Sequence, residues 1–129
     1  SLFDIIAGAA PARSVLSEYH AAASITGTFM VRHGRWKYVY HVGHRPELYD
    51  LVVDPGETTD LAEQPEAFCI LAECHAALLR ICNPEAVNAA AFADQRRRIA
   101  LHGGRDAVIR RGDYGYTPAP GEKAARVVR

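Results

Sequence analysis

The strongest secondary-structure pattern in this chain lies in residues 27–51, GTFMVRHGRWKYVYHVGHRPELYDL. Aromatic and β-branched residues alternate with polar ones over 27–33 and again over 35–42, and this period of two predicts half-buried strands. His33 and Gly34 separate the two runs and suit a two-residue hairpin turn, because the second position of that turn needs a positive φ. The stretch therefore predicts a β-hairpin.

Outward from the hairpin, the pattern predicts further strands and then helices. Residues 13–20 alternate in the same way, and a short β-prone run follows Pro46. We predict an α+β fold in which helices cover one face of a small antiparallel sheet. The four strands are expected at about 13–20, 27–33, 35–42 and 47–52. The helices are expected at about 65–81, 84–101 and 105–111.

The helix predicted at 65–81 has a clear apolar stripe. Its members recur at i, i+3, i+4 and i+7, as on one side of an amphipathic helix. They are Phe68, Leu71, Ala72, His75, Leu78, Leu79 and Cys82. This helix is expected to cover the sheet face that carries Trp36, Tyr38 and Tyr40.

Charge and composition exclude several classes of partner. The 129 residues carry 15 Lys and Arg against 15 Asp and Glu, so the formal net charge is zero. A neutral chain lacks the basic surface that attracts nucleic acids and anionic membranes, so neither is expected as a partner. Three cysteines, an odd and sparse set, argue against a secreted disulfide framework and favour a reducing, cytoplasmic location.

The chain is expected to form one domain, residues 1–112, followed by an extended arm, 113–129, that is rich in Gly, Pro and charge. It opens on the apolar segment SLFDIIAGAA without Met. We interpret 2–10 as the end of a helix and expect the protein to have a further N-terminal part.

Candidate reactive residues are few. Glu18 and His20 share one side of the first strand, whereas Ser17 points to the other. A small hydrolase using Glu18 and His20 directly would need a nucleophile, and none with matching geometry is visible. We therefore predict no catalytic residue in this chain.

No metal site is predicted either. His41-x-x-His44 could supply a ligand pair, but no third ligand stands at fitting spacing. The cysteines Cys69, Cys74 and Cys82 form no CxxC pair, and we expect them to lie on packing faces in the core.

Three segments, taken together, resemble the C-terminal part of bacterial sulfatases, in the alkaline phosphatase superfamily. The first is SVLSEYH (14–20), which is similar to that family's first C-terminal strand. The second is MVRHGRWKYV (30–39), similar to its R-x-G-R-x-K-Y hairpin. The third is the block ELYDL (47–51), DPGE (54–57) and DLA (60–62), with Asp60 where Asn is commoner. The match covers most of residues 1–65, and the later helices are most similar to choline-sulfatase-like and phosphonate-monoester-hydrolase-like members.

The resemblance implies a C-terminal subdomain whose catalytic N-terminal domain is absent from this chain. The family's formylglycine and its divalent cation, usually calcium, belong to that missing domain. The segment Cys82-Asn83-Pro84-Glu85-Ala86 departs from the Cys-x-Pro-x-Arg motif at Ala86 and is better explained as a helix junction.

Such a subdomain is expected to dock on the large sulfatase domain, to shape the substrate pocket or build a homo-oligomer, and to be inactive alone. Apolar surface left uncovered is expected to cause self-association. The substrate-pocket candidates are Glu18, Tyr19 and His20 with the loop 21–26. The alternative is a free-standing interaction module whose hairpin edge and arm bind a protein partner.

Overall fold

The computed structural model describes residues 3, 6–8, 13–20, 24–114 and 126–127. Its contacts group the chain into two compact units, residues 1–89 and 90–129, and each is described by itself. The predicted helix end at 2–10 and the arm at 113–129 lie largely outside the described residues. The boundary expected at 112 therefore stays a prediction.

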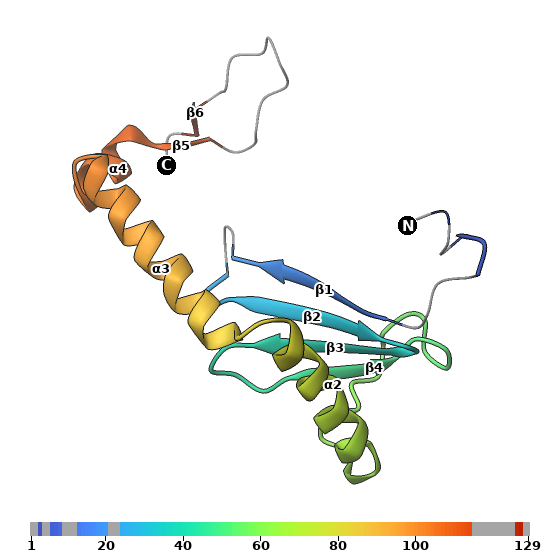
Figure 1. The fold of residues 1–129 in the computed structure, drawn as a ribbon. Helices are drawn as coiled ribbons and strands as arrows, with labels where there is room; N and C mark the ends of the chain where they lie inside the picture. The colour runs from blue at the N-terminus through green and yellow to red at the C-terminus, as the bar shows by residue number, and fades with distance from the viewer. Residues whose placement is uncertain (1–2, 4–5, 9–12, 21–23, 115–125, 128–129) are drawn as a thin grey trace. The chain divides into compact units, whose positions relative to one another are not determined.

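The first unit contains the predicted four-stranded sheet. All neighbouring strands pair antiparallel in the order β1-β2-β3-β4 (Figure 1). The strands are β1 (Ser14–Tyr19), β2 (Thr28–His33), β3 (Trp36–His41) and β4 (Glu47–Asp50). Gly34 takes φ 59° in the turn between β2 and β3, as the hairpin pattern required. The α+β prediction is confirmed, with strand ends displaced by one or two residues.

The register of the strands separates two faces of the sheet. The inner face carries Phe29, Val31, Tyr38 and Leu48, which are side by side across β2, β3 and β4. The outer face carries Tyr19, Thr28, His41, Glu47 and Tyr49, which alternate with them along the strands. Each of these four inner-face residues is at most 1% exposed, so the core lies on this face.

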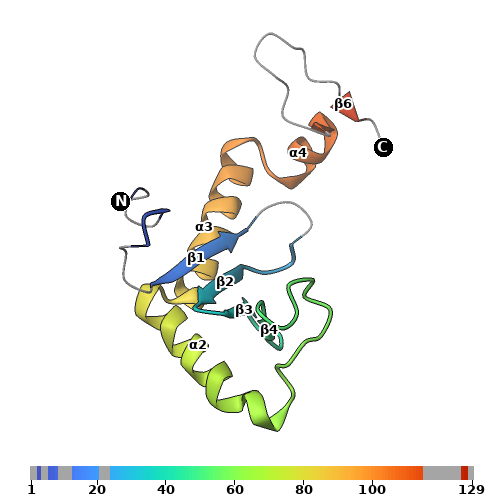
Figure 2. The same cartoon turned by 90° about the vertical axis from the view of Figure 1, so that its right-hand side faces the viewer.

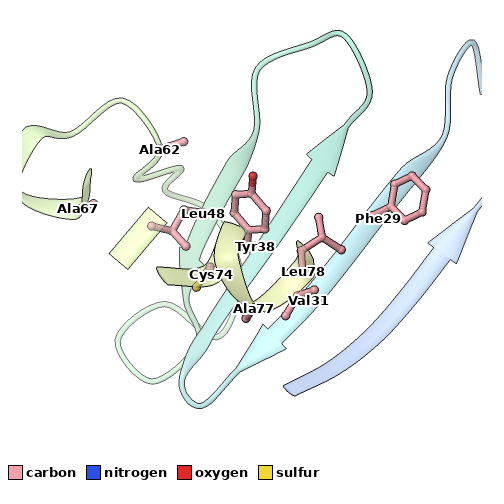
Figure 3. Packing of buried hydrophobic residues seen from close by; sticks show 9 residues of the cluster. All are labelled: Phe29, Val31, Tyr38, Leu48, Ala62, Ala67, Cys74, Ala77 and Leu78. Atoms are coloured by element: carbon pink, nitrogen blue, oxygen red, sulfur yellow. The ribbon is translucent and has the colours of Figure 1, made fainter. Parts of the chain in front are cut away.

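Helices follow the sheet in sequence. They are η1 (Pro65–Ala67), α2 (Phe68–Ile81), α3 (Pro84–Leu101) and α4 (Arg105–Arg111). A short pair, β5 (Asp113–Tyr114) with β6 (Arg126–Val127), belongs to the second unit. Helix α2 lies against the inner face of the sheet (Figures 1 and 2). Figure 3 shows its residues Cys74, Ala77 and Leu78 packed among the inner-face side chains.

The side of α2 that meets the sheet matches only part of the stripe predicted from the sequence, because Leu71, His75, Leu78 and Cys82 pack against the sheet and its core but the other members do not. Leu78 of that stripe is fully buried, but Phe68 is 53% exposed and Leu79 is 51% exposed. Cys74 and Ala77, outside the predicted stripe, are buried instead. The physical reason is that α2 is apolar around most of its circumference, so spacing alone did not single out the side that packs.

The segment after β4 folds back onto the sheet through its acidic side chains. Asp54 accepts hydrogen bonds from the backbone N–H groups of Thr58 (2.7 Å) and Thr59 (2.8 Å), which closes a turn after β4. Asp60 accepts from the backbone N–H of Leu48 at 3.0 Å and so joins this segment to β4. The bond from Thr59 is the largest of the effects that lower the pKa of Asp54. Burial acts to raise the pKa of Asp60, but the bonds from Leu48, Ala62 and Arg45 outweigh it and the pKa is lowered.

In the second unit, the basic residues of α3 lie in solvent. Arg97 and Arg98 are exposed and pair with Asp94 one turn before them. Among the residues that the structure describes, no helix combines the length and the apolar character that crossing a bilayer requires. The cytoplasmic location remains a prediction.

Candidate functional site

The three residues singled out in the sequence lie on opposite faces of the sheet. Glu18 and His20 share the inner side, with His20 Nε2 3.9 Å from Glu18 Oε2. Tyr19 lies on the outer face, beside Thr28 of β2. Strand alternation therefore brings Glu18 and His20 together, as expected, and turns Tyr19 toward different neighbours.

His20 is held in place by packing. Its ring meets Phe29 edge-on, with centroids 5.3 Å apart. The backbone N–H of Gly27 donates to Asn88 Oδ1 at 2.8 Å, and a Cβ built on Gly27 would lie only 2.8 Å from His20 Cε1. A side chain at position 27 would thus disturb both contacts. His20 and Asn88 tie the end of β1 and the start of α3 to the hairpin.

A series of side-chain hydrogen bonds crosses the outer face of the sheet. Thr28 Oγ1 lies 3.1 Å from His41 Nδ1, and His41 Nε2 lies 3.3 Å from Glu47 Oε1. The Tyr49 hydroxyl donates to Glu47 Oε2 at 2.8 Å. This bond to a carboxylate is the main reason why the pKa of Tyr49 is raised to about 12. These hydrogen bonds fix the orientation of the His41 and Glu47 side chains.

Charged side chains flank the hydrogen-bonded residues of the outer face. Lys37 forms an ion pair with Glu57, and its ammonium lies 6.0 Å from the centre of the Tyr49 ring. Glu57 has a positive φ of 54°, which is uncommon for a residue other than glycine. The ion pair therefore attaches the strained turn after β4 to this face.

A cavity of about 590 Å³ opens next to these hydrogen-bonded side chains of the outer face. Its lining combines hydroxyl, imidazole and charged groups with one exposed aliphatic residue. The lining residues are Tyr19, Ser24, Ile25, Thr26, Thr28, His41, His44, Arg45 and Glu47. Tyr19 and residues 24–26 belong to the predicted pocket region, residues 21–23 lie outside the described residues, and Glu18 and His20 do not line the cavity.

The charged groups of the cavity are already compensated within the chain. Arg45 donates to Asp60 Oδ2 at 2.7 Å, and Glu47 is bonded by His41 and Tyr49. The cavity is therefore suited to binding polar groups by hydrogen bonds beside the Tyr19 ring. His41 bonds to Thr28 and Glu47 rather than pairing with His44, and sequence reasoning missed this because it depends on the register of three strands.

The cysteine segment does not suit a formylglycine precursor. Asn83 Oδ1 accepts from the backbone N–H of Ala86 at 3.0 Å, and Pro84 is fully buried at the start of α3. Burial, together with the carboxylates of Glu18 and Glu85, raises the pKa of the Cys82 thiol. This segment is a capped helix junction, as the sequence predicted.

The other cysteines lie on different sides of α2. Cys74 is fully buried, and burial raises the pKa of its thiol to about 11. Cys69 is exposed, so the expectation that all three cysteines lie in the core was wrong for this residue. The two positions point about 140° apart around the helix, so they cannot both face the sheet. Within the described residues, no group of three or more His, Cys, Asp or Glu side chains is placed to hold a metal ion.

Comparison with known proteins relates the chain to one class of enzyme. It is 43% identical over 65 residues to the choline-sulfatase of Rhizobium meliloti (strain 1021), covering 50% of this chain and 13% of that relative. It is 46% identical over 68 residues to the Delta 4,5-hexuronate-2-O-sulfatase of Bacteroides thetaiotaomicron, covering 50% of this chain and 14% of that protein. Arylsulfatase K of Mus musculus is 41% identical over 56 residues, which are 40% of this chain and 10% of that protein. No protein-family model matches the chain.

A solved structure agrees with these relatives. A 2-O GAG sulfatase is 34% identical with a TM-score of 0.52, and the match covers 75% of this chain and 21% of that one. The chain spans only 10% to 14% of the length of the curated relatives described above. The likeness is thus to a small part of each larger protein.

Proposed function

This chain is related to the sulfatases, and from that relation we propose that it is the C-terminal part of a sulfuric ester hydrolase and lacks activity on its own. In the whole enzyme it docks on the large catalytic domain and helps to form the substrate pocket. That domain supplies the chemistry, including the formylglycine and the calcium ion expected of the family.

One observation carries the proposal. Identities of 41% to 46% over 56 to 68 residues are combined with coverage of only 10% to 14% of each relative. A segment this similar to such a small part of larger sulfatases is expected to keep the structural role of that part. The agreement in fold with a solved 2-O GAG sulfatase supports the same role.

The contribution to the pocket is assigned to the end of β1 and the outer face. Tyr19 and residues 24–26 line the cavity, and this supports the proposal that they contact the part of a substrate that remains after the sulfate group leaves. Glu18 and His20 lie behind them on the inner side, and His20 packs on Phe29. We therefore assign contact to Tyr19 and positioning of the strand end to Glu18 and His20.

The proposal is tested by substitution in a sulfatase polypeptide that carries this segment together with its catalytic domain. Tyr19→Ala should lower kcat/KM by about tenfold, because about 1.4 kcal/mol of contact with the transition state is lost. His20→Ala should lower it less, through displacement of Tyr19. The matched control is Val53→Ala, since Val53 is 77% exposed and does not line the cavity.

The kinetics also separate the proposal from its alternative. If Tyr19→Ala and His20→Ala both leave kcat and KM at the level of the Val53→Ala control, the pocket assignment is wrong. Such a result would favour a segment that acts only by binding other protein surfaces.

A further inference from the structure

Two hydroxyl groups that line the cavity have their protons committed to bonds within the chain. Ser24 Oγ donates to the backbone carbonyl of Thr26, and Thr26 Oγ1 donates to the carbonyl of Val42 at 2.9 Å. The lone pairs of both oxygens remain, because a hydroxyl has one proton to donate but can also accept hydrogen bonds. In this part of its lining the cavity therefore offers hydrogen-bond acceptors.

The hydroxyl of Thr28 is oriented by the tautomer of His41. His41 Nε2 lies 3.3 Å from Glu47 Oε1, and this carboxylate can only accept, so the imidazole donates through Nε2. A neutral imidazole that donates through Nε2 accepts through Nδ1. Thr28 Oγ1, which lies 3.1 Å from His41 Nδ1, is then the donor of that bond. Ser24, Thr26 and Thr28 thus all present oxygen lone pairs whose protons are already used.

Hydrogen-bond donors come from the connection between β3 and β4. His44 and Arg45 line the cavity there. Arg45 donates to Asp60 through Nη1, and its guanidinium fork carries further N–H groups. His44 has a ring N–H in either neutral tautomer. A ligand in the cavity therefore meets acceptors from residues 24–28 and donors from residues 44–45.

We propose that the cavity selects the sulfate ester of a neutral polyol, an alcohol with several hydroxyl groups, and that Ser24 and Thr26 determine this specificity. A hydroxyl group both donates and accepts, so it can bond to either part of the lining. The Tyr19 ring supplies apolar surface for the C–H groups of the same ligand. The inference rests on the proposed function, because it names the substrate class of that pocket.

Other classes of ester match this lining less well. A carboxylate or a second sulfate group only accepts hydrogen bonds, so it would face the lone pairs of residues 24–28 without a proton between them. A quaternary ammonium group has no N–H to donate, Arg45 adds a positive charge to the lining, and Glu47 is already bonded at both carboxylate oxygens. An aryl group would leave the polar groups of the lining without partners once water is excluded.

The test compares two esters in a sulfatase polypeptide that carries this segment together with its catalytic domain. One is the best substrate in a set of hexose and inositol monosulfates. The other is cyclohexyl sulfate, which has a similar ring without further hydroxyl groups. The wild type should prefer the polyol ester by at least about tenfold in kcat/KM. Ser24→Ala and Thr26→Val should each reduce this preference about threefold to tenfold, because each removes an acceptor.

The cyclohexyl ester separates loss of recognition from displacement of the backbone. If the variants only move residues 24–26, kcat/KM should fall alike for both esters, whereas loss of an acceptor lowers the value for the polyol ester alone. Ser17→Ala is the matched control, because Ser17 is exposed in β1 and does not line the cavity. It should leave both values unchanged.

A wild type without a preference for the polyol ester would overturn the inference. A higher kcat/KM for choline sulfate or an aryl sulfate than for every polyol ester would also overturn it, as would Ser24→Ala and Thr26→Val variants that keep the full preference. Tyr19→Ala distinguishes these failures from failure of the pocket itself. If Tyr19→Ala lowers kcat/KM for both esters while the polyol preference is absent, the pocket assignment stands and the substrate class is wrong. If Tyr19→Ala changes neither value, the pocket assignment is wrong as well.

Discussion

The two faces of the sheet are stabilised in different ways. On the inner face, Phe29, Val31, Tyr38 and Leu48 are buried under α2, and apolar packing dominates. On the outer face, half-buried polar side chains are joined by hydrogen bonds from Thr28 through His41 and Glu47 to Tyr49. The same strands thus supply a core on one side and a polar site on the other, because side chains alternate along each strand.

This difference separates stability from function. A buried apolar side chain contributes about 25 cal/mol for each Å² of apolar surface removed from water, and its loss also leaves a cavity. A half-exposed hydrogen bond contributes much less net free energy, because water replaces it in the unfolded chain. Substitutions on the inner face should therefore unfold the chain, and those on the outer face should mainly change titration and binding.

The largest effect is expected from truncating the inner face. Phe29→Ala should lower the free energy of unfolding by about 3–5 kcal/mol, because it removes a fully buried ring from between the sheet and its covering. Urea unfolding followed by circular dichroism measures the change. The control is Val52→Ala, at a 68% exposed position, which should change the free energy of unfolding by less than about 0.5 kcal/mol. Equal shifts in the two variants would contradict the assignment of the core.

An intermediate effect is expected where the hairpin meets α3. Gly27→Ala should cost about 1–3 kcal/mol, because the new Cβ would press on His20 and on Asn88 Oδ1, at 2.8 Å and 3.0 Å. Adding His20→Ala should recover part of the loss, since it removes one of the two close contacts. A double variant no more stable than Gly27→Ala would show that the clash with His20 is not the cause.

The smallest effect is expected on the outer face. Glu47→Gln should lower the pKa of Tyr49 from about 12 toward its ordinary value of 10.0, because the carboxylate that holds the phenol proton is gone. Ultraviolet absorbance of tyrosinate, followed as pH rises, measures the shift, and Glu63→Gln serves as an exposed control. An unchanged Tyr49 titration would mean that the bond to Glu47 does not set this pKa.

The same raised pKa makes stability depend on alkaline pH. Between pH 10 and about 12 the folded chain keeps the Tyr49 proton while the unfolded chain has lost it. The contribution of this bond to stability is therefore complete below pH 10 and is lost as pH rises through the folded pKa. Glu47→Gln should reduce the decrease of the free energy of unfolding that occurs as pH rises above 10.

Local pattern was sufficient to predict the strands and helices. The hairpin followed from alternation and from Gly34, and α3 and α4 begin and end at the residues expected. The covered side of α2 did not follow from spacing, because Phe68 and Leu79 have the same apolar character as Leu78. Which of them is buried depends on the sheet and not on the helix itself.

The candidate site was predictable only in part. Strand alternation put Glu18 and His20 on the same face, and their side chains lie 3.9 Å apart. The contact between Gly27 and Asn88 joins residues 61 positions apart, and no local pattern indicates it. The bonds of His41 likewise depend on how β2, β3 and β4 are aligned. Long-range contacts of this kind are set by tertiary packing.

The most direct test of the central claim is a hydrolysis assay of the purified, folded chain with a generic aryl sulfate, with and without calcium. An intact sulfatase in the same assay provides the positive control. Our account predicts no turnover by this chain in either condition, because the chemistry belongs to the catalytic domain of the larger enzyme. Calcium-dependent turnover by the chain alone would contradict it and would mean that these 129 residues contain a complete catalytic site.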